Sequence, residues 1–185
     1  MEEKELIKRV LDGNSHEFGY FVNAYQRMAL TIAFRICENR QEAEDIVQNA
    51  FVKAYHNLHT FHVKSKFSTW FYRIVYNLAV NASKKTLFQS SFVDVKNTEL
   101  ENVAFQDSSV LDKLQHTEIS NAVHEVLGTL PKDLGLILSL YYIEENSIND
   151  IAEILGITKE NVKIRLFRGR KLFIQKWEQL NVLNN

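Results

Sequence analysis

Basic side chains gather in two parts of this sequence, and an acidic stretch separates them. No acidic residue lies between Asp45 and Asp94, and the cations within that interval are Lys53, Lys64, Lys66, Arg73, Lys84 and Lys85. A second set near the C-terminus comprises Lys159, Lys163, Arg165, Arg168, Arg170 and Lys171. Lysine and arginine neutralise nucleic-acid phosphates. The pattern therefore favours two places that contact phosphate, with ordinary solvated helix surface as the alternative.

The C-terminal set lies in a segment with the pattern of a helix-turn-helix, SINDIAEILGITKENVKIRLFRGRKLF. Ser147 and Asp150 form a capping-box signature before an apolar run, and Gly156 can end that helix at a positive φ. Thr158 can cap the next helix, whose inward face would contain Val162 and Leu166. Its outward and flanking residues are Lys163, Ile164, Arg165, Phe167, Arg168, Arg170 and Lys171. A basic helix docked by a tight turn suits the DNA major groove.

The first basic set follows a different helical pattern. Apolar residues recur at helical spacing over residues 66–84, and the helix that this predicts carries Trp70, Arg73, Asn77 and Lys84 on one flank. That flank therefore combines two cations, an amide and an indole. A second apolar stripe over residues 43–58 predicts another helix, which Asn39 and Glu42 can begin as an N-cap pair.

These elements predict an all-α protein with two small helical domains. The expected boundaries are 1–85 and 119–185, with an irregular, acidic linker over 86–118 that lacks helical periodicity. The scarcity of turn residues supports long helices, since the chain has 6 Gly and 1 Pro. Pro131 is expected to begin a new helix within the second domain.

Composition narrows the class of protein further. A single cysteine, Cys37, excludes an internal disulfide framework and fits a reducing compartment. The N-terminal residues lack the apolar core of a secretory signal, and no apolar run reaches membrane-spanning length. We therefore expect a cytoplasmic protein without membrane insertion. No cofactor-binding or catalytic motif is present, and His56, His59 and His62 are a weak metal-site candidate.

Two segments together resemble a known family. AEDIVQNAFVKAY followed by FSTWFYRIVYNLAVNASKK is similar to conserved region 2 of the sigma-70 family of RNA polymerase sigma factors. NAVHEVLGTLPKDLGLILSLYYIEENSINDIAEILGITKENVKIRLFRGRKLF is similar to region 4. Region 3 is absent, and this two-domain plan resembles the extracytoplasmic-function branch. The resemblance covers about residues 5–85 and 119–178.

The resemblance implies a non-enzymatic promoter-specificity subunit that binds core RNA polymerase, promoter DNA and an anti-sigma factor. In the family, the helix that holds Asp45, Gln48, Asn49 and Val52 contacts the clamp helices of the largest polymerase subunit. The minus-10 element would be opened and held by Phe61, Lys64, Lys66, Trp70, Arg73, Asn77 and Lys84. The second helix of the helix-turn-helix would read the minus-35 element through Thr158, Lys163, Ile164, Arg165, Phe167, Arg168, Arg170 and Lys171.

Alternatives remain at several positions. The face around Asp45 is equally compatible with plain solvated surface, and core packing is the favoured interpretation of Trp70. Glu160, Asn161, Ile164 and Gly169 depart from residues common in the family, so relatives do not predict the minus-35 sequence.

A stand-alone helix-turn-helix regulator would explain residues 119–178 but not the N-terminal domain. A helical nucleic-acid enzyme would need an acidic metal cluster, and the sequence shows none.

Overall fold

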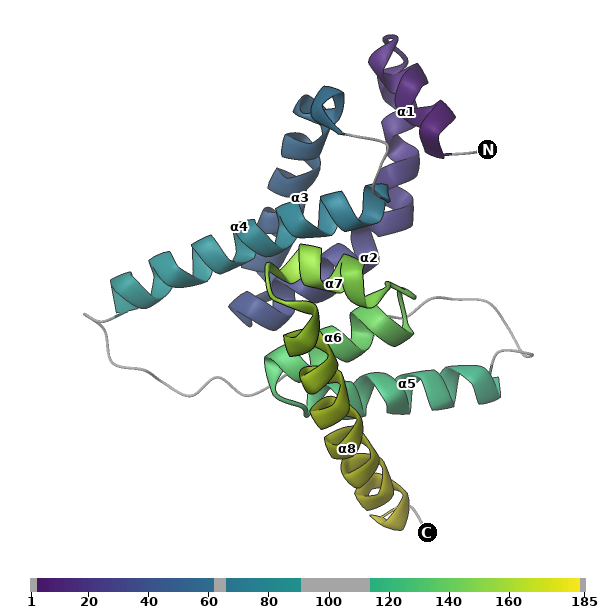
Figure 1. Ribbon diagram of the computed structural model, residues 1–185, viewed down its shortest axis with the longest axis vertical. Coiled ribbons are helices and arrows are strands. Elements are labelled where there is room, and N and C mark those ends of the chain that lie inside the picture. The colour runs from purple at the N-terminus through teal and green to yellow at the C-terminus, as the bar shows by residue number, and fades with distance from the viewer. Residues whose placement is uncertain (1–2, 62–65, 91–113, 184–185) are drawn as a thin grey trace.

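The computed structural model describes the backbone of residues 3–61, 66–90 and 114–183, and the side chains of residues 3–61, 66–84 and 121–179. All regular elements in these residues are helices, which confirms the all-α prediction. The helices form an N-terminal and a C-terminal group that lie against each other (Figure 1).

The N-terminal group is built around an aromatic core. It contains α1 (Glu3–Leu11), α2 (Gly19–Cys37), α3 (Arg40–His56) and α4 (Phe67–Ser90), with short 3-10 turns at Ser15–Phe18 and Leu58–Thr60. Helices α2, α3 and α4 pack on one another in pairs. The ring centroids of Phe21 and Phe67 are 4.3 Å apart, and those of Phe51 and Phe71 are 4.4 Å apart. These rings join the three helices because each helix contributes at least one of them.

A local signal fixes the start of α3, whereas α4 extends beyond its predicted end. The Asn39 side chain accepts a hydrogen bond from the Glu42 backbone N–H at 2.9 Å, as expected of an N-cap. Helix α4 continues to Ser90, and the next helix begins at Leu114. The predicted linker over 86–118 is therefore helical at both of its ends, and residues 91–113 lie outside the described residues.

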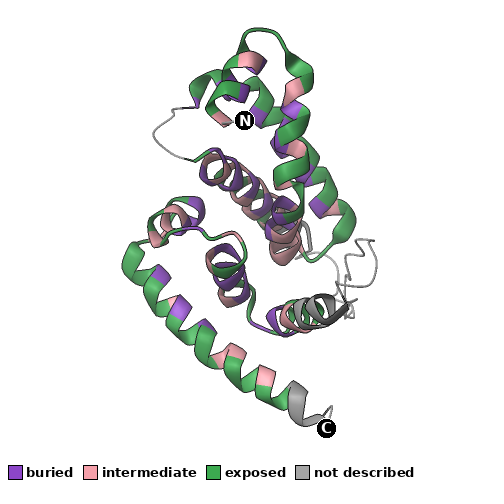
Figure 2. Ribbon diagram, turned by 90° about the vertical axis from the view of Figure 1, so that its right-hand side faces the viewer, coloured by how far each residue is buried: buried purple, intermediate pink, exposed green. Residues whose placement is uncertain are grey.

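The C-terminal group ends in a long helix. It contains α5 (Leu114–Gly128), α6 (Lys132–Tyr142), α7 (Ile148–Leu155) and α8 (Lys159–Leu183). Pro131 is the N-cap residue of α6, so the predicted restart of the chain is confirmed. Helix α8 packs on α6, α7 and α5, and its far side is largely exposed (Figure 2). Gly169 permits the approach to α6, since a Cβ there would lie 3.2 Å from the Leu138 side chain.

The two groups share one buried apolar cluster, which the sequence did not reveal. Helix α4 lies against α7, and α2 lies against α6, so that α7 sits between α4 and α6 (Figure 1). Buried residues run through both groups (Figure 2). In this conformation the two predicted domains are packed together, and the first helix of the helix-turn-helix covers part of the N-terminal group.

Candidate nucleic-acid interface

The helix-turn-helix forms through the local interactions expected from the sequence. The Asp150 backbone N–H donates to Ser147 Oγ at 3.1 Å, and the Ser147 N–H donates to the Asp150 carboxylate at 3.0 Å. Gly156 ends α7 with a φ of 65°, a conformation that costs glycine little. Thr158 then caps the start of α8, because its Oγ1 accepts a hydrogen bond from the Asn161 backbone N–H at 3.2 Å. These contacts confirm the predicted capping box, the glycine stop and the threonine cap.

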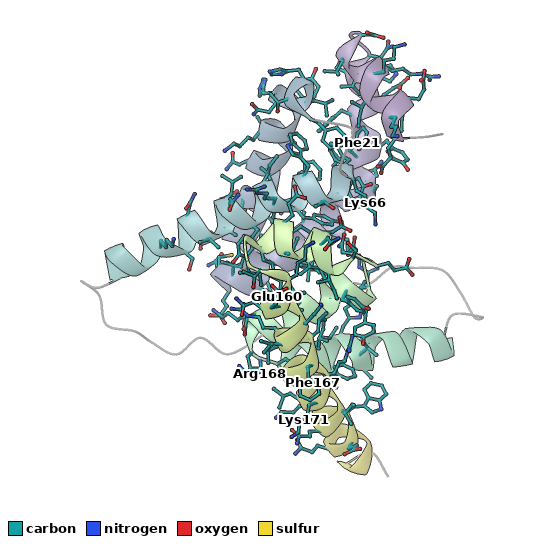
Figure 3. The ribbon with its side chains drawn as sticks, in the orientation of Figure 1. Phe21, Lys66, Glu160, Phe167, Arg168 and Lys171 are labelled. Carbon is teal, nitrogen blue, oxygen red and sulfur yellow. The ribbon has the colours of Figure 1, made fainter. Side chains whose placement is uncertain are left out.

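Buried residues on the inner face of α8 position an exposed basic face. Val162 and Leu166 are buried in the core between the helices. On the opposite face, Phe167 is 69% exposed and Ile164 is 48% exposed, which is unusual for large apolar side chains in water. Exposed cations on this face include Lys163, Arg168 and Lys171. Figure 3 shows Phe167, Arg168 and Lys171 along α8, away from Phe21 inside the N-terminal group.

Two further arginines of α8 contact their own domain. Arg165 Nη1 lies 3.6 Å from the Asp133 carboxylate at the start of α6. The Arg170 guanidinium lies 5.5 Å from the ring centroids of both Tyr141 and Tyr142, a cation–π distance. These contacts orient both side chains at the edges of the exposed face. Thr158, with its hydroxyl used in the helix cap, is also exposed at the start of this face.

The residues predicted to contact the minus-10 element divide into buried aromatics and exposed polar groups. Phe61 is only 8% exposed and packs against Phe67 and half-buried Trp70, at ring-centroid distances of 5.8 and 5.4 Å. Both predicted aromatics are therefore packed against the fold in this conformation. Lys66 is exposed just before α4, and Arg73, Asn77 and Lys84 are exposed along the helix. Lys64 lies outside the described residues.

Two cations, one just before α4 and one within it, are paired with acidic residues of α7. Lys66 Nζ lies 3.8 Å from the Asp150 carboxylate, and Arg73 Nη1 lies 3.9 Å from that of Glu153. Partial burial opposes the ionisation of Asp150, but hydrogen bonds from Ser147 and the Lys66 charge outweigh it and lower the pKa of this carboxyl. Asp150 therefore serves both as the helix-capping residue and as the partner of a candidate DNA-binding lysine.

A buried tyrosine of α4, which sequence reasoning missed, joins the two helical groups. Tyr72 is fully buried, and its hydroxyl donates to the Glu144 carboxylate at 2.7 Å. Burial and the neighbouring Glu144 charge raise the pKa of Tyr72. No signal in the sequence pairs these residues, which lie 72 positions apart.

Further polar contacts lie between α2 and the C-terminal group. Lys132 Nζ lies 2.8 Å from the Glu38 carboxylate. The Arg35 guanidinium covers Gly135, where a Cβ would lie 2.3 Å from Arg35 Nη1 and 2.9 Å from the Leu127 carbonyl oxygen. Burial lowers the pKa of Arg35. The Leu127 carbonyl oxygen is the contact that favours glycine here, because a Cβ could displace the flexible arginine but not the backbone without a shift of the helix.

A third surface lies on α3. The side chains of Asp45, Gln48 and Asn49 are exposed, and Val52 beside them is 57% exposed. The opposite face of α3 is buried through Ile46, Val47, Ala50, Phe51 and Ala54.

Among the described residues, no group of His, Cys, Asp and Glu could hold a metal ion. His62, the third histidine of the candidate metal site, lies outside the described residues. None of the described helices is long and apolar enough to cross a bilayer.

Comparison with known proteins accounts for both helical groups. Residues 21–86 match the family model of sigma-70 region 2, and residues 120–173 match that of sigma-70 region 4. Over 174 residues, the chain is 33% identical to the ECF RNA polymerase sigma factor SigW of Bacillus subtilis, covering 91% of this chain and 92% of SigW. The chain belongs to the extracytoplasmic-function (ECF) sigma factors. It is an RNA polymerase sigma factor that acts in transcription initiation.

A second relative agrees with this assignment, and two solved structures share the fold. The sigma factor is 32% identical to the sigma-H factor of Pseudomonas aeruginosa, over 92% of this chain and 91% of that protein. Its fold is similar to RpoE of Bartonella quintana, solved with the anti-sigma factor NepR, with a TM-score of 0.67, 22% identity and coverage of 88% and 97% of the two chains. CnrH, solved with the cytosolic domain of CnrY, gives a TM-score of 0.59 at 21% identity, with 97% of each chain covered.

Proposed function

We propose that this sigma factor divides its work among three surfaces, on α3, α4 and α8. The observation that carries the proposal is that exposed cations line α4 and α8, whereas α3 presents an exposed polar face with one exposed valine. Two basic surfaces suit two DNA elements, and an exposed apolar residue among polar ones suits a protein partner. The polymerase supplies the chemistry, and this chain supplies recognition in the cytoplasm, where polymerase and promoter DNA meet.

The surface on α8 binds the minus-35 element in the major groove. Arg168 and Lys171 lie on the same exposed face as Ile164 and Phe167, so hydrogen-bonding cations and apolar groups can face base edges together. Lys163 and Thr158 lie nearer the start of the helix, while Arg165 and Arg170 are oriented by Asp133 and by the Tyr141–Tyr142 pair. These flanking positions suit contacts with the phosphate backbone.

The surface on α4 holds the minus-10 strand. Lys66 is exposed just before α4, and Arg73 and Lys84 are exposed along it, so the three cations can follow a phosphate backbone. Asn77, between the two helix cations, can donate to a base. Lys64, which lies outside the described residues, belongs to this proposed surface by sequence. Phe61 and Trp70 shape the start of α4 through their packing on Phe67.

The surface on α3 binds core RNA polymerase through Asp45, Gln48, Asn49 and Val52. The exposed carboxylate and amides can hydrogen-bond a partner, and burial of Val52 would add apolar contact area. We also infer that an anti-sigma factor restrains the protein, because RpoE and CnrH, which share its fold, were solved with NepR and CnrY.

Run-off transcription tests the proposal. Purified core polymerase from the same source is mixed with a pool of genomic promoters, with and without this protein. Discrete new start sites that require the protein are expected. An Asp45→Ala and Gln48→Ala double variant should lose these transcripts and its co-elution with core polymerase. Specific duplex binding by the free protein, with no new transcripts and no binding to core polymerase, would instead identify a stand-alone regulator.

A further inference from the structure

One acidic side chain lies on the otherwise basic outward face of α8. Glu160 is exposed in the first turn of the helix, and it is the only acidic residue in 159–177. Figure 3 shows it at the start of α8, with Phe167, Arg168 and Lys171 farther along the same helix. Phosphates repel a carboxylate that faces DNA, so an acid at this position is unexpected unless it makes a specific contact.

The helix repeat places Glu160 on the part of α8 that points away from the domain. Val162 and Leu166 are buried on the inner face. Ile164 and Lys171 follow Glu160 at intervals of four and seven residues, so these three exposed residues form one stripe opposite the buried face. In helix-turn-helix complexes, residues near the start of the second helix contact base edges. The Glu160 carboxylate is therefore directed toward bases rather than toward the phosphate backbone.

No contact within the protein uses the Glu160 carboxylate. The cap of α8 is made by Thr158 Oγ1 and the Asn161 backbone N–H. Within the part of the chain that the structure describes, Glu160 forms no ion pair or side-chain hydrogen bond, although Lys159 and Lys163 are exposed nearby. A negative charge near a helix N-terminus is favourable, which explains why an acid is tolerated but not why it faces outward. Its oxygens remain available to accept from a ligand.

We propose that Glu160 determines specificity at the minus-35 surface by accepting a hydrogen bond from the N4 amine of a cytosine. An ionised carboxylate can only accept hydrogen bonds. In the major groove cytosine presents an amine donor, whereas guanine and thymine present oxygen acceptors that repel a carboxylate. Adenine presents its amine beside the N7 acceptor, which disfavours the second carboxylate oxygen. The inference rests on the proposed function of α8 and adds the kind of base that this surface selects.

The side chains around Glu160 suit such a contact. Lys159 and Lys163 are exposed on either side of it in sequence, so they can bind neighbouring phosphates and offset the repulsion of the carboxylate. Ile164, one turn farther along, is 48% exposed and would exclude water from the contact when DNA docks. A hydrogen bond to a charged group is stronger where water is excluded, and a mismatched base that leaves the group unpaired costs more there.

A binding selection tests the assignment. Core polymerase that carries the protein is mixed with a promoter found by run-off transcription, in which each minus-35 position is randomised in turn, and the bound DNA is sequenced. At one position the wild-type complex should prefer cytosine over thymine by about fivefold or more. Glu160→Gln should lose this preference and favour adenine, because a glutamine amide pairs with adenine N6 and N7. Absence of a cytosine preference in wild type, or its persistence in the variant, would overturn the proposal.

A base analogue isolates the hydrogen bond itself. The base 2-pyrimidinone differs from cytosine by the absence of the N4 amine. At the selected position it should weaken binding by the wild-type complex about fivefold more than binding by the Glu160→Ala complex. The lost hydrogen bond within the base pair is common to both measurements and cancels in the comparison. Equal losses for the two complexes would show that Glu160 does not bind this amine.

A control separates base reading from a structural or purely electrostatic role. Glu178→Gln makes the same charge change at an exposed position about 27 Å farther along α8 and should leave every base preference unchanged. If Glu160 acted only on helix stability or net charge, Glu160→Gln would change affinity equally for all sequences, and this inference would be rejected.

The outcomes also distinguish this inference from the proposed function. If the wild-type protein directs no discrete start sites with core polymerase, the function proposed for α8 fails, and the role of Glu160 fails with it. If start sites appear but the base preferences do not depend on Glu160, the proposed function stands and this inference alone is rejected.

Discussion

The basic surfaces of α4 and α8 have similar composition but different accessibility. On α8, Arg168 and Lys171 face solvent beside Phe167, and no described acidic residue is paired with them. On α4, Lys66 and Arg73 each face a carboxylate of α7. This contrast shows that tertiary packing decides whether the cations of a basic helix are exposed and unpaired, and therefore available to bind DNA. The two surfaces should therefore respond differently to mutation, salt and polymerase.

The largest expected effect comes from a buried charge in the packing that presents α8. Val162 is fully buried, so Val162→Asp should destabilise the C-terminal group by roughly 3 kcal/mol or more, because the carboxylate loses hydration without gaining a partner. Ile164→Asp, two residues away on the exposed face, should change stability by less than about 0.5 kcal/mol. Chemical unfolding followed by circular dichroism measures both variants. Similar losses would contradict the inward and outward faces assigned to α8.

Removal of one exposed cation from α8 should weaken DNA binding without weakening the polymerase binding assigned to α3. Arg168→Ala is expected to weaken binding to minus-35 duplex by about 1–3 kcal/mol if the side chain reads a base, and to reduce the salt slope by about 1 if it binds phosphate. Core-polymerase binding should not change. Lys176→Ala, exposed farther along α8, is the matched control. Equal loss of polymerase and duplex binding would contradict the division of labour.

A smaller and conditional effect is expected at α4. Because Arg73 is already paired with Glu153, Arg73→Ala should change the affinity of free protein for a minus-10 oligonucleotide by less than about twofold. In the polymerase complex, where α4 is proposed to hold the minus-10 strand, the same variant should lose roughly 1 kcal/mol of strand binding. Lys53→Ala on α3 provides a control of equal charge. An equal effect of Arg73→Ala on strand binding by the free protein and by the polymerase complex would contradict the difference in accessibility between α4 and α8.

The smallest expected effect concerns pH. The pKa of Asp150 is lowered in the folded protein, so its ionised form stabilises the fold above the unfolded pKa of about 3.9, and this contribution is lost as the pH falls through the folded value. Asp150→Asn should cost about 1 kcal/mol at pH 7, mainly through the cap and the Lys66 contact. The difference in unfolding free energy between variant and wild type should shrink below about pH 4. A constant difference would contradict a role for the ionised carboxylate.

The helices and much of the α8 surface followed from local sequence. The capping box of Ser147 and Asp150, the positive φ of Gly156 and the cap by Thr158 all depend on residues within a few positions of one another. The periodicity that buries Val162 also exposes Arg168, because both follow from the helix repeat. Such features are readable because the interacting groups are neighbours along the chain.

Prediction from local periodicity was less complete for α4, and it did not reveal the contact between the two helical groups. In α4, the apolar residues Ile74 and Leu78 are only half-buried, whereas the polar-tipped Tyr72 is fully buried. Tyr72 departs from the apolar stripe because α7 covers an additional side of α4. The predicted minus-10 role of Phe61 stays a prediction, and only the tertiary structure shows that its ring packs against those of Phe67 and Trp70.

The sequence by itself determined the helices, their caps, the two basic groups and the family, since these depend on local spacing and on motifs contiguous in the chain. Tertiary structure alone decided which basic surface is open. The pairs Tyr72–Glu144, Lys66–Asp150 and Arg73–Glu153 join residues far apart in sequence. No local propensity encodes such pairs, because they exist only when the apolar faces of α4 and α7 are buried against each other.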